Sequence, residues 1–350
     1  MTSARPICHL NLASGFAGGE RQTLILIREL AARGIPQRLV ACESSGLGKR
    51  CEGLPGLDIR AVSGNAIAAA FHVRGARLAH AHDGRAVYAA LLARRLFGVP
   101  YVITRRIVTS KPISGLRGLA YNGAARVAAV SQAAATALEQ NGLRSRVVPI
   151  LSTHAEFSVD DAEVARIRAA HPGKTLLGHT GALRHAAKGQ STIIEVAQRA
   201  ATTHPDWHFL LCGEGDDRKR FEREIGDLNN VELVGWVDNV GDYLAAFDVF
   251  VFPSPKEALG SSLLDALQFG LPIVASNVEG IPEVVEDGVN GRLVEPENAE
   301  QLYAAIEALL ADEGELAAIR ARNKEKSKLH SATHMADAYE TLYEEIVTSV

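Results

Sequence analysis

The sequence predicts an α/β protein built from two Rossmann-like domains, each a doubly wound parallel sheet. The 350 residues, 47% of them hydrophobic, exceed what one core ordinarily buries, although a single barrel is compatible with the length alone. Short apolar or β-branched runs alternate with helical patterns in both halves, as in parallel sheets covered by helices. The periodic pattern breaks near 152–172. Two such domains facing one another would form a cleft, with ligands at the carboxyl ends of the strands.

The first half of the chain is expected to form seven strands. Each is a short run of apolar or β-branched residues bounded by turn residues. The runs cover residues 7–13, 38–44, 58–63, 78–83, 101–106, 127–131 and 146–150. Helical periodicity fills the intervals, for example in RQTLILIREL at 21–30.

The second half repeats the theme with five more strands and intervening helices. The strands are expected at 175–183, 207–213, 231–237, 248–254 and 272–278, with helical segments at 216–228 and 298–312. We therefore assign 1–158 to an N-terminal domain and 159–332 to a C-terminal domain. A last helix within 333–350 is expected to pack back on the N-terminal domain.

The composition predicts a soluble, cytoplasmic protein. No run approaches the about 18 uninterrupted apolar residues of a membrane span, and the N-terminal stretch MTSARPICHLNLASG is too short and strand-like for a secretory signal. The four cysteines have no C-x-x-C spacing, so we expect buried, reduced thiols rather than a zinc site or a disulfide framework.

The two halves of the chain carry opposite charge. Residues 1–158 contain 20 Lys/Arg against 8 Asp/Glu, a net charge of +12, whereas residues 159–350 contain 17 against 33, a net charge of −16. No acidic residue occurs between Gly84 and Leu138, a stretch with eight cations. Such a stretch favours an anionic partner; the alternative is a solvated face whose arginines pair with acids from elsewhere.

A glycine-rich loop follows the first predicted strand. In SGFAGGERQTL, Gly18 and Gly19 precede a predicted helix, so the backbone can approach a ligand and the helix N-terminus can offer N–H groups to a phosphate. The segment is not G-x-G-x-x-G, and any tight turn between a strand and a helix would use glycine in the same way.

Two cations occupy the loop after the first strand of the second half. GALRHAAKGQ places Arg184 and Lys188 between a strand and a helix, where two positive charges can neutralise a diphosphate. Taken alone, they are equally compatible with an ordinary charged surface loop.

Two carboxylates flank the loop in SPKEALGSSLLDALQFG at 254–270. Glu257 follows an apolar strand, where it can accept hydrogen bonds from hydroxyl groups, and Asp265 is expected in the first turn of a helix that begins near Ser261 or Ser262. The pair suits a polyhydroxylated ligand such as a sugar nucleotide. For Asp265 the alternative is a capping box with Ser262.

Two histidines lie on the strand that leads to Asp83. We expect His80 and His82 to point to opposite faces, and therefore to be poorly arranged to bind one metal ion together. A hydrogen-bonded structural role is the commoner case for either. His82 lies nearer the strand end and is the better candidate for contact with sugar hydroxyls.

Taken together, these motifs resemble the retaining glycosyltransferases of family 4. The resemblance lies in the order of the motifs: the glycine-rich loop, K-G at 188–189, G-E-G at 213–215, P-S at 253–254, Glu257 with an acid eight positions later, E-G-I-P-E at 279–283 and D-G-x-N-G at 287–291. It covers most of the chain. It implies a GT-B fold, with a sugar-nucleotide donor held by the C-terminal domain and an acceptor held largely by the N-terminal one.

The resemblance also implies roles for individual residues. Lys188 and Arg184 would contact the donor diphosphate, Glu257 the sugar and phosphate, and Asp265 the ribose. Further donor contacts would come from Gly18, Gly19, Gly213 and Glu283. The sequence departs from the family pattern at Asp265, where glutamate is usual, and at Ala182, where the family often has arginine.

These observations predict a glycosyltransferase that moves a sugar from a nucleotide diphosphate donor to an anionic acceptor with retention of configuration. The acceptor would be lipopolysaccharide core or another glycolipid at the cytoplasmic membrane face, contacted by Arg105 and Arg106. No metal cofactor and no nucleic-acid partner are expected, and no persuasive D-x-D motif is present. The alternatives are a sugar-nucleotide 2-epimerase and a non-catalytic sugar-nucleotide-binding protein.

Overall fold

The computed structural model describes residues 5–349 and divides into two compact units. Unit 1 comprises the residues up to Ala155 together with those from His330 onward, and unit 2 comprises Glu156–Leu329. Within the segment of 152–172 where the sequence pattern breaks, a helix, α7 (Asp161–Ala170), begins behind its N-cap Asp160. The first unit is therefore built from two separate parts of the chain.

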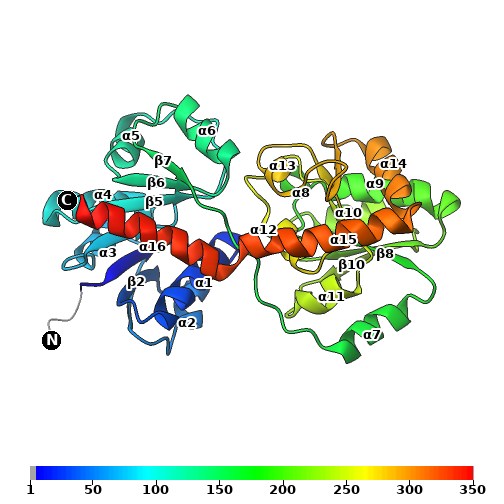
Figure 1. Ribbon diagram of the computed structural model, residues 1–350, viewed down its shortest axis with the longest axis horizontal. Helices are drawn as coiled ribbons and strands as arrows, with labels where there is room; N and C mark the ends of the chain where they lie inside the picture. Colours follow the sequence, from blue (N-terminus) through cyan, green and yellow to red (C-terminus); the bar gives the residue numbers. More distant parts are fainter. Residues whose placement is uncertain (1–4, 350) are drawn as a thin grey trace. The chain divides into compact units, whose positions relative to one another are not determined.

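Unit 1 holds a seven-stranded parallel sheet in the order β3-β2-β1-β4-β5-β6-β7 (Figure 1). The strands are β1 (Ile7–Asn11), β2 (Gln37–Cys42), β3 (Leu57–Val62), β4 (Leu78–Ala81), β5 (Tyr101–Arg105), β6 (Arg126–Ala129) and β7 (Val147–Pro149). The helices are α1 (Gly18–Ala32), α2 (Gly46–Arg50), α3 (Ala66–Phe71), α4 (Ala86–Phe97), α5 (Gly115–Asn122), α6 (Gln132–Gln140) and α16 (Ala332–Thr348). Every residue of β1 and β4 is buried, as expected for strands covered on both faces.

Unit 2 holds a six-stranded parallel sheet in the order β10-β9-β8-β11-β12-β13. The strands are β8 (Thr175–Thr180), β9 (Trp207–Cys212), β10 (Val231–Gly235), β11 (Val249–Phe252), β12 (Ile273–Ser276) and β13 (Gly291–Val294). After α7, the helices are α8 (His185–Lys188), α9 (Gln190–Thr203), α10 (Arg218–Ile225), α11 (Val240–Ala246), α12 (Ser261–Gln268), α13 (Ile281–Val284), α14 (Ala299–Leu310), α15 (Glu313–Ser327) and the 3-10 turn η1 (Lys328–His330).

All twelve predicted strands are present, and their ends lie within three residues of the predicted bounds. The α/β class with two doubly wound parallel sheets is thereby confirmed. Strand β13 was not predicted, because its sequence lies in a glycine-punctuated segment. A Cβ at Gly291 would lie 2.6 Å from the carbonyl oxygen of Ile273, so glycine lets this edge strand pack closely against β12.

The last helix, α16, belongs to unit 1. Its buried residues, such as Met335, Tyr339 and Tyr343, form one core with Leu26 and Leu30 of α1. Tyr343 shares a hydrogen bond with Nδ1 of His80 at 2.6 Å, and Tyr339 shares one with Thr104 at 2.7 Å. Helix α16 is thus joined by both apolar and polar contacts to the rest of unit 1.

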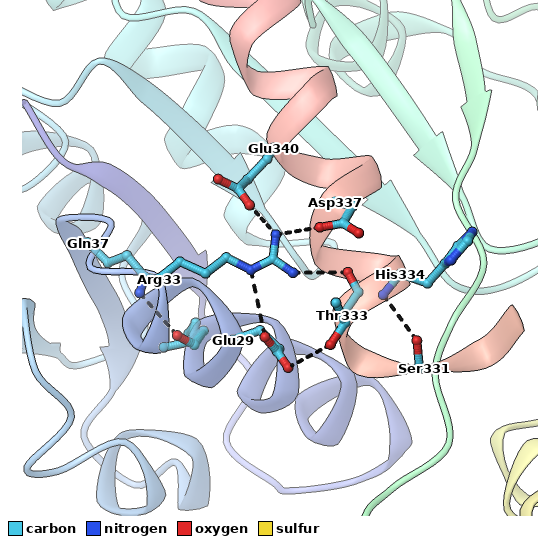
Figure 2. Close-up of polar contacts among 9 residues, drawn as sticks. Glu29, Arg33, Gln37, Ser331, Thr333, His334, Asp337 and Glu340 are labelled. Carbon is cyan, nitrogen blue, oxygen red and sulfur yellow. Dashed lines mark hydrogen bonds and ion pairs between the residues drawn. The ribbon is translucent and has the colours of Figure 1, made fainter. Parts of the chain in front are cut away.

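Arg33, at the end of α1, fastens α1 to α16 (Figure 2). Its guanidinium donates to Oδ1 of Asp337 at 2.6 Å, to the Glu340 carboxylate and to the carbonyl oxygen of Thr333 at 3.1 Å. Nε also lies 3.7 Å from Oε2 of Glu29. Only 23% of the Arg33 side chain is exposed, so these bonds are partly shielded from water.

We expect Arg33→Ala to lower the melting temperature of the full chain by about 2–4 °C, which corresponds to about 1 kcal/mol for a partly exposed ion pair. Thermal unfolding followed by far-UV circular dichroism measures this change. Arg28→Ala is the matched control, because Arg28 is an exposed arginine of the same helix. Equal shifts for the two variants would contradict this account of the contact.

Candidate functional site

Several of the predicted site residues follow the strands at which the order of each sheet reverses. In unit 2 the chain order changes direction between β8 and β11; Lys188 follows β8 and Glu257 follows β11. In unit 1 it changes direction between β1 and β4; Gly18 follows β1 and His82 follows β4. At such a point the loops after the two strands diverge, which leaves a crevice suited to a ligand.

Lys188 and Glu257 meet directly in unit 2. Nζ of Lys188 donates to Oε2 of Glu257 at 2.5 Å, and the two side chains are 22% and 18% exposed. Nζ also lies 5.0 Å from the centre of the Phe252 ring. A half-buried ammonium and carboxylate are thereby held side by side, one able to contact a phosphate and the other able to accept hydrogen bonds from hydroxyl groups.

Glycines allow the loops that carry this pair to approach one another. Gly189 has a φ of +69°, and a Cβ there would lie 2.1 Å from the carbonyl oxygen of Pro253. A Cβ at Gly280 would lie 1.8 Å from the carbonyl oxygen of Ala258, next to Glu257. No side chain fits at either contact, so the K-G and E-G-I-P-E motifs have a packing reason as well as a proposed functional one.

Arg184 is the N-cap of α8, the short helix that ends at Lys188, and has a more open position than Lys188. Its Nη2 lies 3.2 Å from Oδ2 of Asp216, and the two side chains are 63% and 84% exposed. Gly213, after β9, closely approaches the loop between β8 and α8, since a Cβ there would lie 2.0 Å from the carbonyl oxygen of Gly181. The backbone places Arg184 beyond the carboxyl end of β8. Its guanidinium has to break its contact with Asp216 before it can contact a ligand.

Asp265 lies deeper in α12 than the sequence analysis predicts. The helix begins at Ser261, so Asp265 is its fifth residue, and the first turn of α12 contains no acid. The N-cap is Gly260, which has a φ of +90° and no side chain with which to cap. The prediction of a first-turn position was therefore wrong, and so was the alternative of a capping box with Ser262. Asp265 is 2% exposed.

Glu283 lies in the short helix α13, which follows β12. It is half-buried, and its backbone N–H donates to the carbonyl oxygen of Gly280 at 3.2 Å. The roles of Asp265 and Glu283 toward a donor stay predictions.

His179 lies beside Lys188 and was missed by the sequence analysis. It is buried, and its Nδ1 contacts the carbonyl oxygen of Val251 at 2.9 Å. A Cβ at Gly181 would lie 3.3 Å from Nε2 of His179 and 3.6 Å from Cδ of Lys188, so both side chains flank this glycine. Burial lowers the pKa of His179 to about 4, and the Lys188 charge acts in the same direction. The signal that would have found it is a polar residue in an apolar run, two positions before the motif glycine.

In unit 1 the glycine loop lies beside Arg106. Gly18 and Gly19 are the first residues of α1 rather than residues before it, and a Cβ at Gly19 would lie 3.6 Å from Cδ of Arg106. Glu20 accepts a hydrogen bond from the Ala17 N–H at 3.0 Å. This carboxylate occupies part of the helix end that was predicted to attract a phosphate, while Arg106 supplies a positive charge nearby.

His80 and His82 lie on the same side of the sheet, not on opposite sides as the sequence analysis predicts. Residues two apart on a strand share a face, and the two rings are 3.7 Å apart between centroids. His9 of β1 joins them; its Nδ1 shares a hydrogen bond with Nε2 of His82 at 3.0 Å. One ring nitrogen from each of the three lies within 4.8 Å of the others.

His80 and His82 of the buried histidine cluster are engaged by neighbouring groups. Nη1 of Arg106 donates to the carbonyl oxygen of His82 at 3.0 Å, and Nη2 lies 3.3 Å from Nδ1 of the same residue. His80 contacts Thr104 and Tyr343. The guanidinium disfavours a second cation beside His82, so this cluster is a poor metal site. A contact between His82 and sugar hydroxyls stays a prediction.

Arg105 and Arg106 point into different surroundings. Arg106 contacts His82 and Thr23, whereas Nε of Arg105 donates to the carbonyl oxygen of Ile107 at 3.1 Å and Nη1 lies 3.4 Å from the Tyr121 hydroxyl. Of the two, Arg106 adjoins the glycine loop. Consecutive residues leave a strand on opposite sides, which explains the different surroundings. Contacts of Arg105 and Arg106 with an acceptor stay a prediction.

The histidine cluster predicts a loss of stability in mild acid. Burial lowers the pKa of His9 to about 4 and those of His80 and His82 well below the usual value, and Arg106 lowers the latter two further. The unfolded chain, with a histidine pKa near 6.5, binds more protons below about pH 6.5. The free energy of unfolding therefore falls as the pH is lowered from 6.5 to 4, by up to about 1.4 kcal/mol per pH unit for each group. Above about pH 6.5 the three histidines do not change it.

Urea denaturation between pH 7.5 and 5.5 measures this slope below the range of most carboxylates. His9→Gln should make it shallower, while His334→Gln, at an exposed position of α16, should leave it unchanged. A free energy of unfolding that stays constant across this range would contradict the neutral state of the cluster.

Two family models match this chain, one in each unit. Residues 16–151 match the model described as Glycosyltransferase Family 4, and residues 174–312 match the model described as Glycosyl transferases group 1. No helix within residues 5–349 has the length and apolar character required to cross a membrane.

The chain is also similar to curated relatives. The lipopolysaccharide core biosynthesis glycosyltransferase LpsE of Rhizobium meliloti is 35% identical over 128 residues, which cover 36% of this chain and 36% of the relative. The 2-deoxystreptamine glucosyltransferase of Streptomyces kanamyceticus is 26% identical over 259 residues, 66% of this chain and 67% of the relative. The match to LpsE thus spans about a third of that protein's length.

Solved structures share the fold over nearly the whole chain. HepE of Anabaena in complex with UDP-glucose has a TM-score of 0.85 at 20% identity, covering 99% of this chain and 100% of HepE. A glycosyltransferase from Rickettsia africae has a TM-score of 0.85 at 16% identity, with the same coverage. These likenesses show that the two Rossmann-like units have the GT-B fold.

Proposed function

We propose that this protein is a glycosyltransferase that moves a sugar from a nucleotide diphosphate donor to an anionic acceptor, with retention of configuration. The observation that carries the proposal is the contact between Lys188 and Glu257 at the point where the strand order of unit 2 reverses. Family models for glycosyltransferases match residues in both units and support it. The UDP-glucose in the HepE structure makes this sugar nucleotide the first donor to test.

The proposed chemistry assigns separate roles to the two charges. The bond between the anomeric carbon and the diphosphate breaks, a bond to an acceptor hydroxyl oxygen forms, and the hydroxyl proton is released. Negative charge grows on the departing diphosphate, where Lys188, and Arg184 once it leaves Asp216, stabilise it. Glu257 accepts hydrogen bonds from the sugar hydroxyls and orients the ring. The positive charge in this mechanism comes from side chains, with no metal cofactor.

The charge of unit 1 supports an anionic acceptor. Within residues 5–349, none of the eight cations of the acid-free stretch forms an ion pair with a carboxylate. Arg94, for example, donates to the carbonyl oxygen of Gly98, and Arg117 to that of Lys111. Their charges are therefore not held in direct ion pairs with carboxylates, although the carboxylates of Glu20 and Asp83 act on the charge of Arg106 from nearby. Lipopolysaccharide core and other anionic glycolipids are the acceptors we propose.

Exposed apolar side chains accompany these cations at the surface of residues 94–119, which include the end of α4, the loop after β5 and most of α5. The apolar residues Leu96, Ile107, Leu116 and Leu119 are each more than half exposed. Beside them in sequence stand the cations Arg94, Arg95, Lys111 and Arg117. We propose that this surface rests on the anionic cytoplasmic face of a membrane, where cations meet the headgroups and leucines reach the acyl boundary.

We expect the double substitution Arg94→Ala/Arg95→Ala to weaken binding to anionic vesicles by about thirtyfold, since each surface cation contributes about 1 kcal/mol. Co-sedimentation with phosphatidylserine vesicles across a salt series measures the change, and binding should weaken as salt rises. Lys219→Ala/Arg223→Ala, which removes the same charge from exposed positions of unit 2, should have little effect. Salt-independent binding, or equal losses in the two variants, would contradict the proposed surface.

An assay with and without an acceptor tests the proposed function. The full chain is incubated with nucleotide diphosphate sugars alone, and then with anionic and neutral glycan acceptors. Transfer that requires an acceptor supports the proposal. Isomerised donor in the acceptor-free reaction would instead indicate a 2-epimerase, and saturable binding without any product across the panel would indicate a sugar-nucleotide-binding protein.

A further inference from the structure

A second cluster of metal-binding side chains lies in unit 2, at the opposite ends of the strands from Lys188. His208 is the second residue of β9 and Glu232 the second residue of β10, whereas the proposed donor site lies after the carboxyl ends of the strands. His171 follows α7 as its C-cap. Three elements that are separate in sequence thus bring two imidazoles and a carboxylate together.

The three side chains are close enough to share one ion. Nε2 of His171 lies 3.7 Å from Oε2 of Glu232, and the two imidazole centroids are 4.3 Å apart. One ligand atom from each residue lies within 4.8 Å of the others. Donors on one zinc ion are at most about 4 Å apart, because each bond is about 2.0–2.2 Å long. The distance between His171 and Glu232 already meets this limit, and the upper bound of 4.8 Å for the three atoms exceeds it by less than about 1 Å.

His208 gives the cluster an unused ligand atom. Its Nε2 is buried and has no hydrogen-bond partner among residues 5–349. Leaving a buried polar nitrogen unpaired is costly, which calls for a partner that the protein itself does not supply. Burial, together with the nearby His171 and Lys174, lowers the pKa of this imidazole to about 4, so the ring is neutral and able to donate a lone pair to a metal.

The surroundings tolerate a cation better than those of the other histidine cluster. There a guanidinium contacts His82 directly, and the cluster contains no carboxylate. Here Glu232 contributes a negative charge. Lys174 follows His171 closely in sequence, but its Nζ is engaged elsewhere, because it donates to the carbonyl oxygen of Pro205 at 2.6 Å. Two imidazoles and one carboxylate, with a fourth position open to water, are a donor set that suits zinc.

We propose that His171, His208 and Glu232 form a zinc-binding site that fastens the end of α7 to the β9–β10 edge of unit 2. The ion would take one nitrogen from each histidine and one carboxylate oxygen, with water as the fourth ligand. Since β10 is an edge strand of the sheet, the ion would stabilise a part of the unit that has neighbours on only one side. This site is independent of the proposed transfer reaction.

Calorimetric titration of zinc chloride into the full chain, stripped with a chelator and free of any affinity tag, tests the proposal. We expect one ion per chain and a higher melting temperature with zinc. His208→Ala and His171→Ala should each weaken binding by more than tenfold, since even removal of an outer partner of a metal ligand costs about 10–100-fold. Cobalt in place of zinc should give the visible absorption of tetrahedral coordination in the wild type alone.

His204→Ala is the matched control. His204 is paired with Glu307 at 2.9 Å and belongs to neither of the two clusters of metal-binding side chains found within residues 5–349, so its loss should leave zinc affinity unchanged. Melting in chelator shows whether each variant folds. Absence of saturable zinc binding by the wild type, or wild-type affinity in folded His208→Ala and His171→Ala, would overturn the proposal.

Discussion

Replacing Lys188 by alanine should lower turnover by about 100- to 1000-fold, or about 2.7–4 kcal/mol in activation free energy. Lys188 is the half-buried cation at the strand-order reversal of unit 2, and its ammonium is held by Glu257 and Phe252. A charge fixed in this way needs no reorganisation when the diphosphate departs, so its loss is felt most in the transition state. Steady-state rates with donor and acceptor measure the effect.

Lys256→Ala provides the control for that substitution. Lys256 is an exposed lysine in the loop that carries Glu257. The substitution therefore removes the same charge close to the site but leaves the contact between Lys188 and Glu257 in place. Arg184→Ala should have a smaller effect than Lys188→Ala, since Arg184 is mostly exposed and paired with Asp216. Wild-type turnover in folded Lys188→Ala would refute the assignment.

Glu257→Gln should lower turnover by about 10- to 100-fold while leaving the affinity for the nucleoside diphosphate unchanged or higher. The carboxylate is proposed to hold the sugar hydroxyls, and a hydrogen bond to a charged group is worth about 1.5–3 kcal/mol. In Glu257→Gln the side chain at position 257 has no negative charge. Lys188 therefore has no anionic partner to leave, and its ammonium is more available to the diphosphate. The measurement compares turnover with the dissociation constant for UDP.

The two effects must separate if Lys188 and Glu257 act on different parts of the donor. Glu286→Gln, at an exposed glutamate that follows α13, is the control and should change neither quantity. A parallel loss of turnover and of UDP affinity in Glu257→Gln would show that Glu257 supports the nucleotide rather than the sugar. Unchanged turnover would exclude it from the reaction.

Much of the fold was predictable because its signals are local. Strands such as β4 and β11 are short apolar runs flanked by turns, and buried parallel strands have that appearance. Lys188 and Glu257 were predicted as site residues because each follows such a run, and loops after parallel strands gather at one end of the sheet.

Most of the errors and omissions have physical causes that concern neighbours far away in sequence. Strand β13 depends on the close approach of Gly291 to β12, which no local pattern reveals. The start of α12 is set by Gly260 in a left-handed conformation, and this moved Asp265 into the second turn. His9 joins His80 and His82 only through the pairing of β1 with β4. The contact of His171 with Glu232 likewise joins elements that are far apart along the chain.

The central claim is that unit 2 binds a donor diphosphate through Lys188, and calorimetric titration of UDP-glucose and a panel of other nucleotide diphosphate sugars tests it most directly. We predict saturable binding of at least one of them to the wild type, at least tenfold weaker binding to Lys188→Ala, and unchanged binding to Lys256→Ala. No binding to the wild type across the panel, or equal affinities for the wild type and Lys188→Ala, would contradict the account.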